Sequence, residues 1–254
     1  MFTSNIQQFL TTLTLAFGLA TCISSNACSD DATPSQPDAA VTPDAPASVD
    51  APPGCDPQTV LPSKYRPIPL VSEGLLAITV SNNISTGTID ATAGGIANSA
   101  DRPYIYIDLR NGRKVEVTDL ASRSSMDWDI ALKRSSLRSN SGDSGAGNRK
   151  VAVVAATDLT TVTVGPASGY TTDDFTSADC MFTGIPGGEP QSVFAEWYNY
   201  DQATNQLSPK PEVYVVERSD GSRSAFRIVT YYGDPASAMR GAFYRVEFKA
   251  LPNR

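Results

Sequence analysis

The chain has 254 residues, a net charge of −7 and no histidine. Histidine is the usual general base near neutral pH and a common ligand of zinc and of haem iron, so its absence excludes catalysis by Ser-His-Asp or Cys-His groups and disfavours a zinc site. The first 54 residues hold five Asp and no Lys or Arg, which leaves 20 basic and 22 acidic residues for the rest; this near-neutral body is not expected to bind nucleic acid.

The N-terminal 27 residues are typical of an export signal. Residues 9–20 (FLTTLTLAFGLA) form an apolar run with the length of a signal-peptide core, too short to span a bilayer as a helix. The preceding segment, MFTSNIQQ, lacks the positive charge that such signals normally carry. We expect cleavage before Cys22, where LATC resembles a bacterial lipobox, or before Cys28, which follows the small residues SNA. The cysteine is then lipidated; the alternative is plain cleavage that leaves it free or paired in a disulfide.

Residues 28–54 predict a disordered tether. The stretch from 29 to 54 contains six Pro, six Ala and five Asp in 26 residues and no aromatic side chain, so it cannot bury enough apolar surface to offset the entropy of ordering. Residues 55–254 are then expected to form one domain. In an exported protein Cys55 and Cys180 are the natural disulfide pair; two free thiols are the alternative.

The domain is expected to be all-β, antiparallel and sandwich-like, with many hairpins. Two hairpins are predicted at Asn111-Gly112 and Asp220-Gly221, because these dipeptides favour tight turns between β-rich runs. Residues 244–249 alternate apolar and charged side chains, as a half-buried strand does. Residues 126–137 are read as one strand with Trp128, Ile130 and Leu132 on one face, and 150–156 as another; no stretch shows a capped helical repeat.

Two further motifs have alternative interpretations. The glycine-rich stretch 140–147 (NSGDSGAG) lacks the Lys-Ser/Thr of a phosphate-binding loop and precedes a strand, so we expect a turn with unusual backbone angles. Asp127 and Asp129 are spaced like paired acid-base carboxylates about 7 Å apart on a strand, but a solvated strand face explains them better. We therefore do not expect an enzyme.

The order of these motifs resembles the HmuY family of bacterial haem-binding lipoproteins. The similarity covers roughly residues 88–251 and is carried by YIYIDLRNGRKVEV (104–117), WDIALKR (128–134) and NSGDSGAG (140–147). The resemblance implies an all-β fold, a surface location at the outer membrane, and haem capture for iron acquisition through an outer-membrane receptor. The family's two haem-ligating histidines have no counterpart in this sequence, so no ligand carries over.

The resemblance therefore leaves haem as a cofactor whose ligand must be another residue. Met181, in the segment that corresponds to the family's first ligand region, is the candidate iron ligand, although a methionine in a β-domain is more often a gap-filler. Trp197, Tyr198 and Tyr200 could flank a porphyrin, with Tyr200 as a phenolate ligand, or could simply be core aromatics. The alternative function is a surface interaction protein that keeps the fold, has lost haem and binds another ligand or protein.

Overall fold

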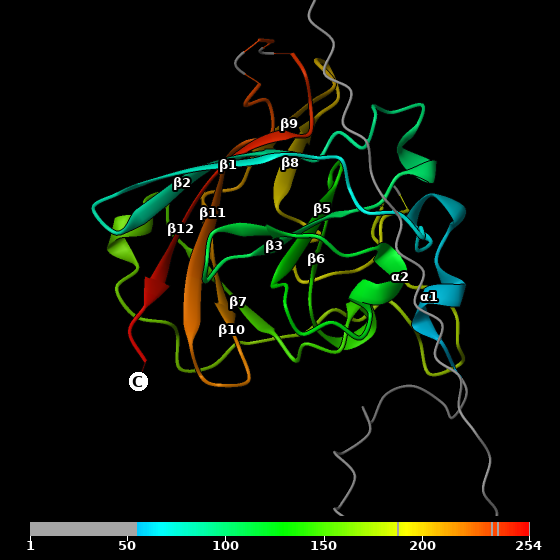
Figure 1. Cartoon of the computed structure of the whole chain (residues 1–254), viewed down its shortest axis with the longest axis horizontal. Helices are drawn as coiled ribbons and strands as arrows, with labels where there is room; N and C mark the ends of the chain where they lie inside the picture. The colour runs from blue at the N-terminus through cyan, green and yellow to red at the C-terminus, as the bar shows by residue number, and fades with distance from the viewer. Residues whose placement is uncertain (1–54, 187, 235, 238, 254) are drawn as a thin grey trace, which may run out of the picture. The chain divides into compact units, whose positions relative to one another are not determined.

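The computed structural model describes residues 55–253, except 187, 235 and 238. The predicted signal peptide, tether and lipidated cysteine therefore lie outside the described residues. Figure 1 shows a body built almost entirely of strands. Its helices are single turns: α1 (Pro57–Val60), α2 (Asp119–Ser122) and the 3-10 turns η1 (Ser63–Tyr65), η2 (Ser99–Asp101), η3 (Gly142–Ser144) and η4 (Leu159–Thr161). The predicted all-β class is confirmed.

The strands form two main antiparallel sheets and one separate hairpin. The larger sheet has the order β1-β2-β12-β11-β10-β7 and consists of β1 (Leu76–Ser81), β2 (Ile84–Asp90), β12 (Phe243–Leu251), β11 (Arg223–Thr230), β10 (Glu212–Glu217) and β7 (Lys150–Ala155). The smaller sheet has the order β4-β3-β5-β6 and consists of β4 (Arg113–Val115), β3 (Ile105–Asp108), β5 (Ile130–Lys133) and β6 (Ser136–Ser139). The hairpin pairs β8 (Tyr198–Asp201) with β9 (Gln206–Pro209).

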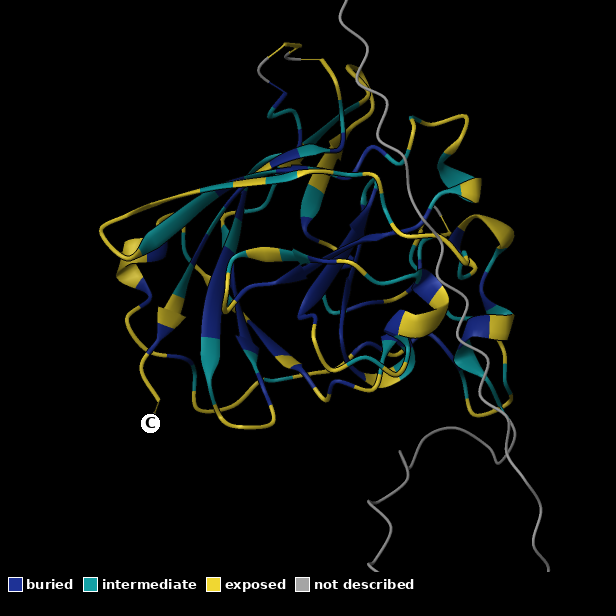
Figure 2. Ribbon diagram, viewed as in Figure 1, coloured by how far each residue is buried: buried dark blue, intermediate teal, exposed yellow. Residues whose placement is uncertain are grey.

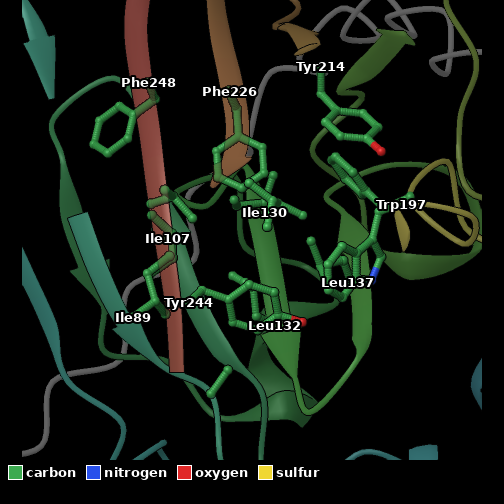
Figure 3. Close-up of a cluster of buried hydrophobic side chains, with 14 of the residues drawn as sticks. Ile89, Ile107, Ile130, Leu132, Leu137, Trp197, Tyr214, Phe226, Tyr244 and Phe248 are labelled. Atoms are coloured by element: carbon green, nitrogen blue, oxygen red, sulfur yellow. The ribbon is translucent and has the colours of Figure 1, made fainter. Parts of the chain in front are cut away.

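The main core lies between the two sheets. It joins Ile107, Ile130 and Leu132 of the smaller sheet to Phe226 and Tyr244 of the larger one, with further side chains around them (Figure 3). Burying such side chains contributes about 1.5–3 kcal/mol each. This packing of one sheet on the other is the predicted sandwich.

Each sheet also covers a second cluster on its other face. Val213, Val215 and Ala225 of the larger sheet pack on η4. On the smaller sheet, β3, β5 and β6 are buried on both faces, which Figure 2 shows in dark blue. Their outer face carries Tyr104 and Tyr106 against Trp128 and Phe175. All three clusters draw their buried residues from positions 61–251, so this part of the chain supplies its own core.

The predicted hairpin turns are confirmed. β3 and β4 are joined around Gly112 (φ 60°), and β10 and β11 around Gly221 (φ 79°), both with the positive φ that glycine tolerates. In β12 the alternation holds: Tyr244, Val246 and Phe248 are buried in the main core.

The prediction of a single strand over residues 126–137 is wrong. The chain turns at Arg134 (φ 53°), whose backbone N–H donates to the carbonyl of Ala91, and this splits the segment into β5 and β6. Trp128 precedes β5 and packs with Tyr106 in the outer cluster, whereas Ile130 lies in the main core. The three residues expected on one face therefore lie on two.

The interpretation of Asp127 and Asp129 as a solvated face is also wrong. Asp127 is exposed, but Asp129 is 1% exposed and forms ion pairs with Arg149 and Arg218, which are themselves buried. The backbone N–H of Leu109 donates to the same carboxylate at 2.8 Å. A buried carboxylate is retained where charge partners and hydrogen bonds satisfy it, which sequence spacing does not reveal.

The glycine-rich stretch is a closely packed turn. Gly142 has φ 49°, and a Cβ there would lie 2.0 Å from the carbonyl oxygen of Asp173, so both backbone angle and space require glycine. The buried side chain of Asn140 fixes the rest of the loop: its amide donates to the carbonyls of Ser125 and Trp128 and its oxygen accepts from the N–H of Gly147, each at 2.9 Å. The predicted unusual backbone is confirmed at Gly142.

Candidate functional site

An open groove lies beside the β8–β9 hairpin. It has a volume of about 710 Å³, within the range of roughly 300–1,000 Å³ typical of small-molecule sites. Its lining is Ser135, Ile185, Pro186, Ala195, Glu196, Tyr198, Asn199, Tyr200, Leu207 and Lys210. Two of the predicted site residues, Tyr198 and Tyr200, are therefore brought together in one hollow.

Tyr198 and Tyr200 both line the groove because side chains alternate between the two faces of strand β8. Tyr198 and Tyr200 are two residues apart in β8 and so share a face of the ribbon. The turn between the strands is closed by Asp201, whose carboxylate accepts from the N–H of Ala203 at 2.9 Å and from the hydroxyl of Thr204 at 2.7 Å. Asn205, with φ 55°, completes it. Local turn chemistry thus sets this wall of the groove.

The two tyrosines differ in environment. Tyr200 is 52% exposed and donates a hydrogen bond to the side-chain oxygen of Asn205 at 2.6 Å. Tyr198 is half-buried and packs edge-on against Trp197, with ring centroids 4.9 Å apart. Burial, reinforced by the charge of Glu189, raises the pKa of Tyr198, so this hydroxyl stays protonated.

Trp197 lies beneath the groove. It is 1% exposed and packs against Tyr231 and Tyr244. Figure 3 shows Trp197 within the main core. Its indole N–H donates to the carbonyl of Ser135 at 2.8 Å. Trp197 thus supports Tyr198 from behind and does not itself line the groove.

The opposite wall is a folded-back ribbon within residues 175–191. Bridges join Thr176 to Phe182 and Gly184 to Pro190, and the second turn carries the groove residues Ile185 and Pro186. That turn is fastened to the smaller sheet by Glu189, which accepts a hydrogen bond from the hydroxyl of Ser135. Burial raises the pKa of Glu189, and the nearby charge of Lys64 lowers it by less.

Met181 lies on the first turn of this ribbon, away from the groove lining. Its side chain is 65% exposed, and the turn is closed by the N–H of Ser177 donating to the Met181 carbonyl at 2.9 Å. Met181 and Ile185 are four positions apart, about 13 Å along an extended chain. The neighbouring Cys180 forms a disulfide with Cys55, with Cα atoms 5.9 Å apart, which holds this turn beside the start of the domain.

Charge is confined to one side of the groove. Lys210 and Glu196 are its charged lining residues, and their ammonium and carboxylate groups lie 3.4 Å apart. Glu196 is far more exposed than Lys210 (side chains 80% and 27%), so the pair is weakened by solvent. The groove can therefore hold a flat apolar body with an acidic group at Lys210. Sequence spacing does not reveal Ile185, Leu207 and Lys210, because Ile185 comes from the ribbon of residues 175–191 and the other two come from β9 and the residue after it.

The described residues contain no group of three or more Cys, Asp or Glu side chains placed to hold a metal ion. No described helix is long and apolar enough to cross a membrane.

Comparisons with known proteins place the chain in a family. No curated protein matches it. Among solved structures, it is similar to one described as an HmuY-like haem-binding protein from Bacteroides vulgatus (22% identity, 68% of this chain and 96% of that one, TM-score 0.46). It is also similar to an apo HmuY analogue from Tannerella forsythia (18%, 72% and 99%, TM-score 0.46) and to a lipoprotein from Bacteroides fragilis (16%, 73% and 97%, TM-score 0.48). The family model described as HmuY protein matches residues 101–244, more than half of the sequence, and the chain therefore belongs to the HmuY family.

Proposed function

We propose that this chain is an exported surface protein that binds haem or a related tetrapyrrole in the groove beside the β8–β9 hairpin. The observation that carries the proposal is the groove's composition: the tyrosines 198 and 200 on one wall, Ile185, Pro186 and Leu207 among the apolar residues, and a single ammonium, Lys210. A porphyrin has two flat apolar faces and acidic propionates, and this lining complements both features. The role is binding, not catalysis.

Iron ligation in this proposal falls first to Tyr200. Tyr200 lines the groove, its hydroxyl hydrogen-bonds to Asn205, and tyrosine oxygen is an established haem ligand type. Bound haem would supply an iron centre; the chain would orient it and exclude water from one face. Met181 remains the second candidate, but its place on a separate turn means that it reaches the groove only if the ribbon moves.

The cellular part of the proposal rests on the sequence. An N-terminal signal, cleavage before Cys22 or Cys28, a lipid anchor and the acidic tether would display residues 55–254 at the outer membrane or cell surface. From there the protein would pass iron porphyrin to an outer-membrane receptor, and shed chains would act as soluble carriers.

A second candidate function is a surface interaction protein that has lost haem. The absence of histidine and the distance of Met181 from the groove favour it. It predicts that another flat apolar ligand, or a partner's side chain, occupies the groove.

Titration of residues 55–254 with haemin tests the first function against the second. We expect a saturable Soret band at micromolar haemin. Tyr200→Phe, which removes one oxygen, should shift the band if the phenolate ligates iron. Met181→Leu should leave it unchanged, as should Met126→Leu, a matched substitution at a half-exposed methionine outside the groove. No saturable change in the wild-type spectrum would end the haem proposal and leave the second function.

A further inference from the structure

The larger sheet ends in two edge strands that are treated differently. At β7, the N–H and C=O of Val151 pair with those of Thr171, both at 2.9 Å, so that edge is partly covered. At the other end β1 pairs with β2, and among the described residues no segment pairs with its outer side (Figure 1). Alternate backbone N–H and C=O groups of β1 thus face outward, as they do on any strand paired on one side.

β1 also lacks the features that protect an open edge. Natural edge strands carry Lys or Pro, contain a bulge, or are covered by other parts of the chain. Residues 75–83 (LLAITVSNN) hold no charged residue and no proline. The pairing with β2 runs without a break from Leu76↔Ile89 to Ser81↔Ile84. The edge is therefore straight, uncharged and open to a further strand.

Exposed apolar side chains lie at both ends of this edge. Leu75, directly before β1, is 72% exposed, and Val80, near the end of β1, is 70% exposed. Figure 2 shows this edge in yellow and teal. Covering both side chains would remove apolar surface from water, which favours association.

We propose that β1 pairs antiparallel with β1 of a second copy of this chain, with Ile78 opposite Ile78. Leu76 and Ile78 point to the main core, and Val80 shares their face but lies beyond the end of the core. A two-fold axis normal to the sheet keeps the core faces on one side. It then places Leu76 of one copy beside Val80 of the other, so the most exposed residue of that row becomes covered.

The strand is complementary to itself in this register. On the strand face that points away from the core, Ala77 of one copy lies opposite Thr79 of the other. Like charges placed opposite each other would oppose pairing, but residues 75–83 carry no charge. A shift by one residue would place the core-facing side chains of one copy beside the solvent-facing side chains of the other, so the faces that meet are defined. The acidic tether of the same chain is a poor competitor, because its six prolines cannot donate to a strand ladder.

The contact is small. A six-residue strand pair buries less than the roughly 1,000 Å² of a stable interface, so the dimer should be weak and dependent on concentration. Anchoring at a membrane would raise the local concentration and favour it.

Sedimentation velocity of residues 55–254, from micromolar to near-millimolar protein, tests the proposal. The wild type should shift from the monomer mass toward twice that mass. Val80→Lys should stay monomeric throughout, whereas Val153→Lys, at a 51% exposed valine of β7, should associate like the wild type. Circular dichroism and thermal melts check that both variants fold. A wild type that remains monomeric overturns the proposal and leaves the edge to a strand of another protein; so does association of Val80→Lys equal to wild type.

Oxidative cross-linking tests the register. Opposite residues of paired strands have Cβ atoms about 5 Å apart, slightly more than the roughly 3.5–4.5 Å of a disulfide. A small shift between two separate chains closes this gap, so Ile78→Cys should cross-link two copies. In the same register the two copies of residue 80 lie four positions apart, about 13 Å, and Val80→Cys should not cross-link. Cross-linking through position 80 but not 78 would overturn the proposed pairing.

Discussion

The carboxylate of Asp129 accepts a hydrogen bond from the guanidinium of Arg149 at 2.8 Å in the interior, 20 residues apart in sequence. Arg218, from the end of β10, contacts the other carboxylate oxygen. One buried anion thereby joins the start of β5 to the segment before β7 and to the larger sheet.

Replacing Asp129 by Asn should destabilise the domain strongly. The substitution leaves Arg149 and Arg218 buried without a counter-charge, and breaking a buried pair from one side costs about 3–5 kcal/mol. Urea unfolding followed by tryptophan fluorescence measures this loss. Asp127→Asn, two residues away and exposed, is the matched control and should change stability by less than about 0.5 kcal/mol. Equal effects at both positions would contradict the role given to the buried pair.

Gly142→Ala should strongly lower the unfolding free energy of the domain. The new Cβ would lie 2.0 Å from the carbonyl oxygen of Asp173, a backbone atom that cannot move alone, and φ is 49°. We expect a loss of more than about 3 kcal/mol in the unfolding free energy, or failure to fold. Gly169→Ala separates the steric clash from the cost of a positive φ. Gly169 has φ 83°, but no atom lies within 4 Å of the added Cβ. This variant should therefore lose only about 1 kcal/mol, from the unfavourable backbone conformation.

Asp173 should make stability depend on pH. Burial raises its pKa to about 6, although Ser144, Val193 and Ser139 donate hydrogen bonds to it. Because the folded-state pKa lies above that of the unfolded chain, the folded state binds the proton more tightly, and ionisation opposes folding. The contribution of this group is thus most favourable below about pH 4 and is lost as the pH rises toward 6, by about 3 kcal/mol in total.

The Asp173→Asn variant isolates this effect. Its cost relative to wild type should be larger at pH 4 than at pH 7, since the wild type alone loses stability over that interval. Unfolding free energies from urea titrations at both pH values measure the difference. Asp174→Asn, at the exposed neighbour, is the matched control, and its cost should be below about 0.5 kcal/mol. If the cost of Asp173→Asn instead grew with pH, the folded-state pKa of Asp173 would be lowered and not raised.

Short-range signals account for the part of the fold that the sequence predicts. The turns at Gly112 and Gly221 and the alternation of β12 depend on neighbouring residues alone. The β1–β2 hairpin was missed although it carries a comparable signal, since Asn82 and Asn83 both have positive φ (50° and 62°), a conformation that asparagine tolerates. The turn at Arg134 has no such signal, because it depends on a contact with Ala91 far away in sequence.

The candidate site was predictable only in its aromatic part. Tyr198 and Tyr200 follow from a local Trp-Tyr-Asn-Tyr pattern, but the groove also needs Ser135, Ile185 and Lys210. The ribbon of residues 175–191 and its hydrogen bond to Ser135 bring Ile185 to the groove, whereas the N–H of Lys210 donates to the carbonyl of Trp197 at 2.9 Å. Contacts between residues so far apart in the chain produce no recognisable residue spacing in the sequence.

The disulfide should stabilise both the domain and the groove wall. Cys55 and Cys180 are 125 residues apart, and closing so long a loop restricts the unfolded chain, which typically contributes about 2–4 kcal/mol. The double variant Cys55→Ala with Cys180→Ala should lower the free energy of unfolding, measured by urea titration, by that amount. Adding a reductant should lower the wild type similarly and leave the double variant unaffected. A wild type insensitive to reductant would contradict a stabilising cross-link.

Lys210 should contribute to ligand affinity through charge alone. Its ammonium group is the positive charge of the groove lining, and the exposed Glu196 neutralises it only weakly. If haem propionates pair with it, Lys210→Gln should weaken haemin binding by roughly three- to tenfold, in line with about 1 kcal/mol for a partly exposed pair. Raising the salt concentration should weaken binding to the wild type and have less effect on the variant.

Lys150→Gln, at an exposed lysine of β7, is the control and should bind as the wild type does. Equal affinities for all three proteins would show that the acidic groups of the ligand do not meet Lys210.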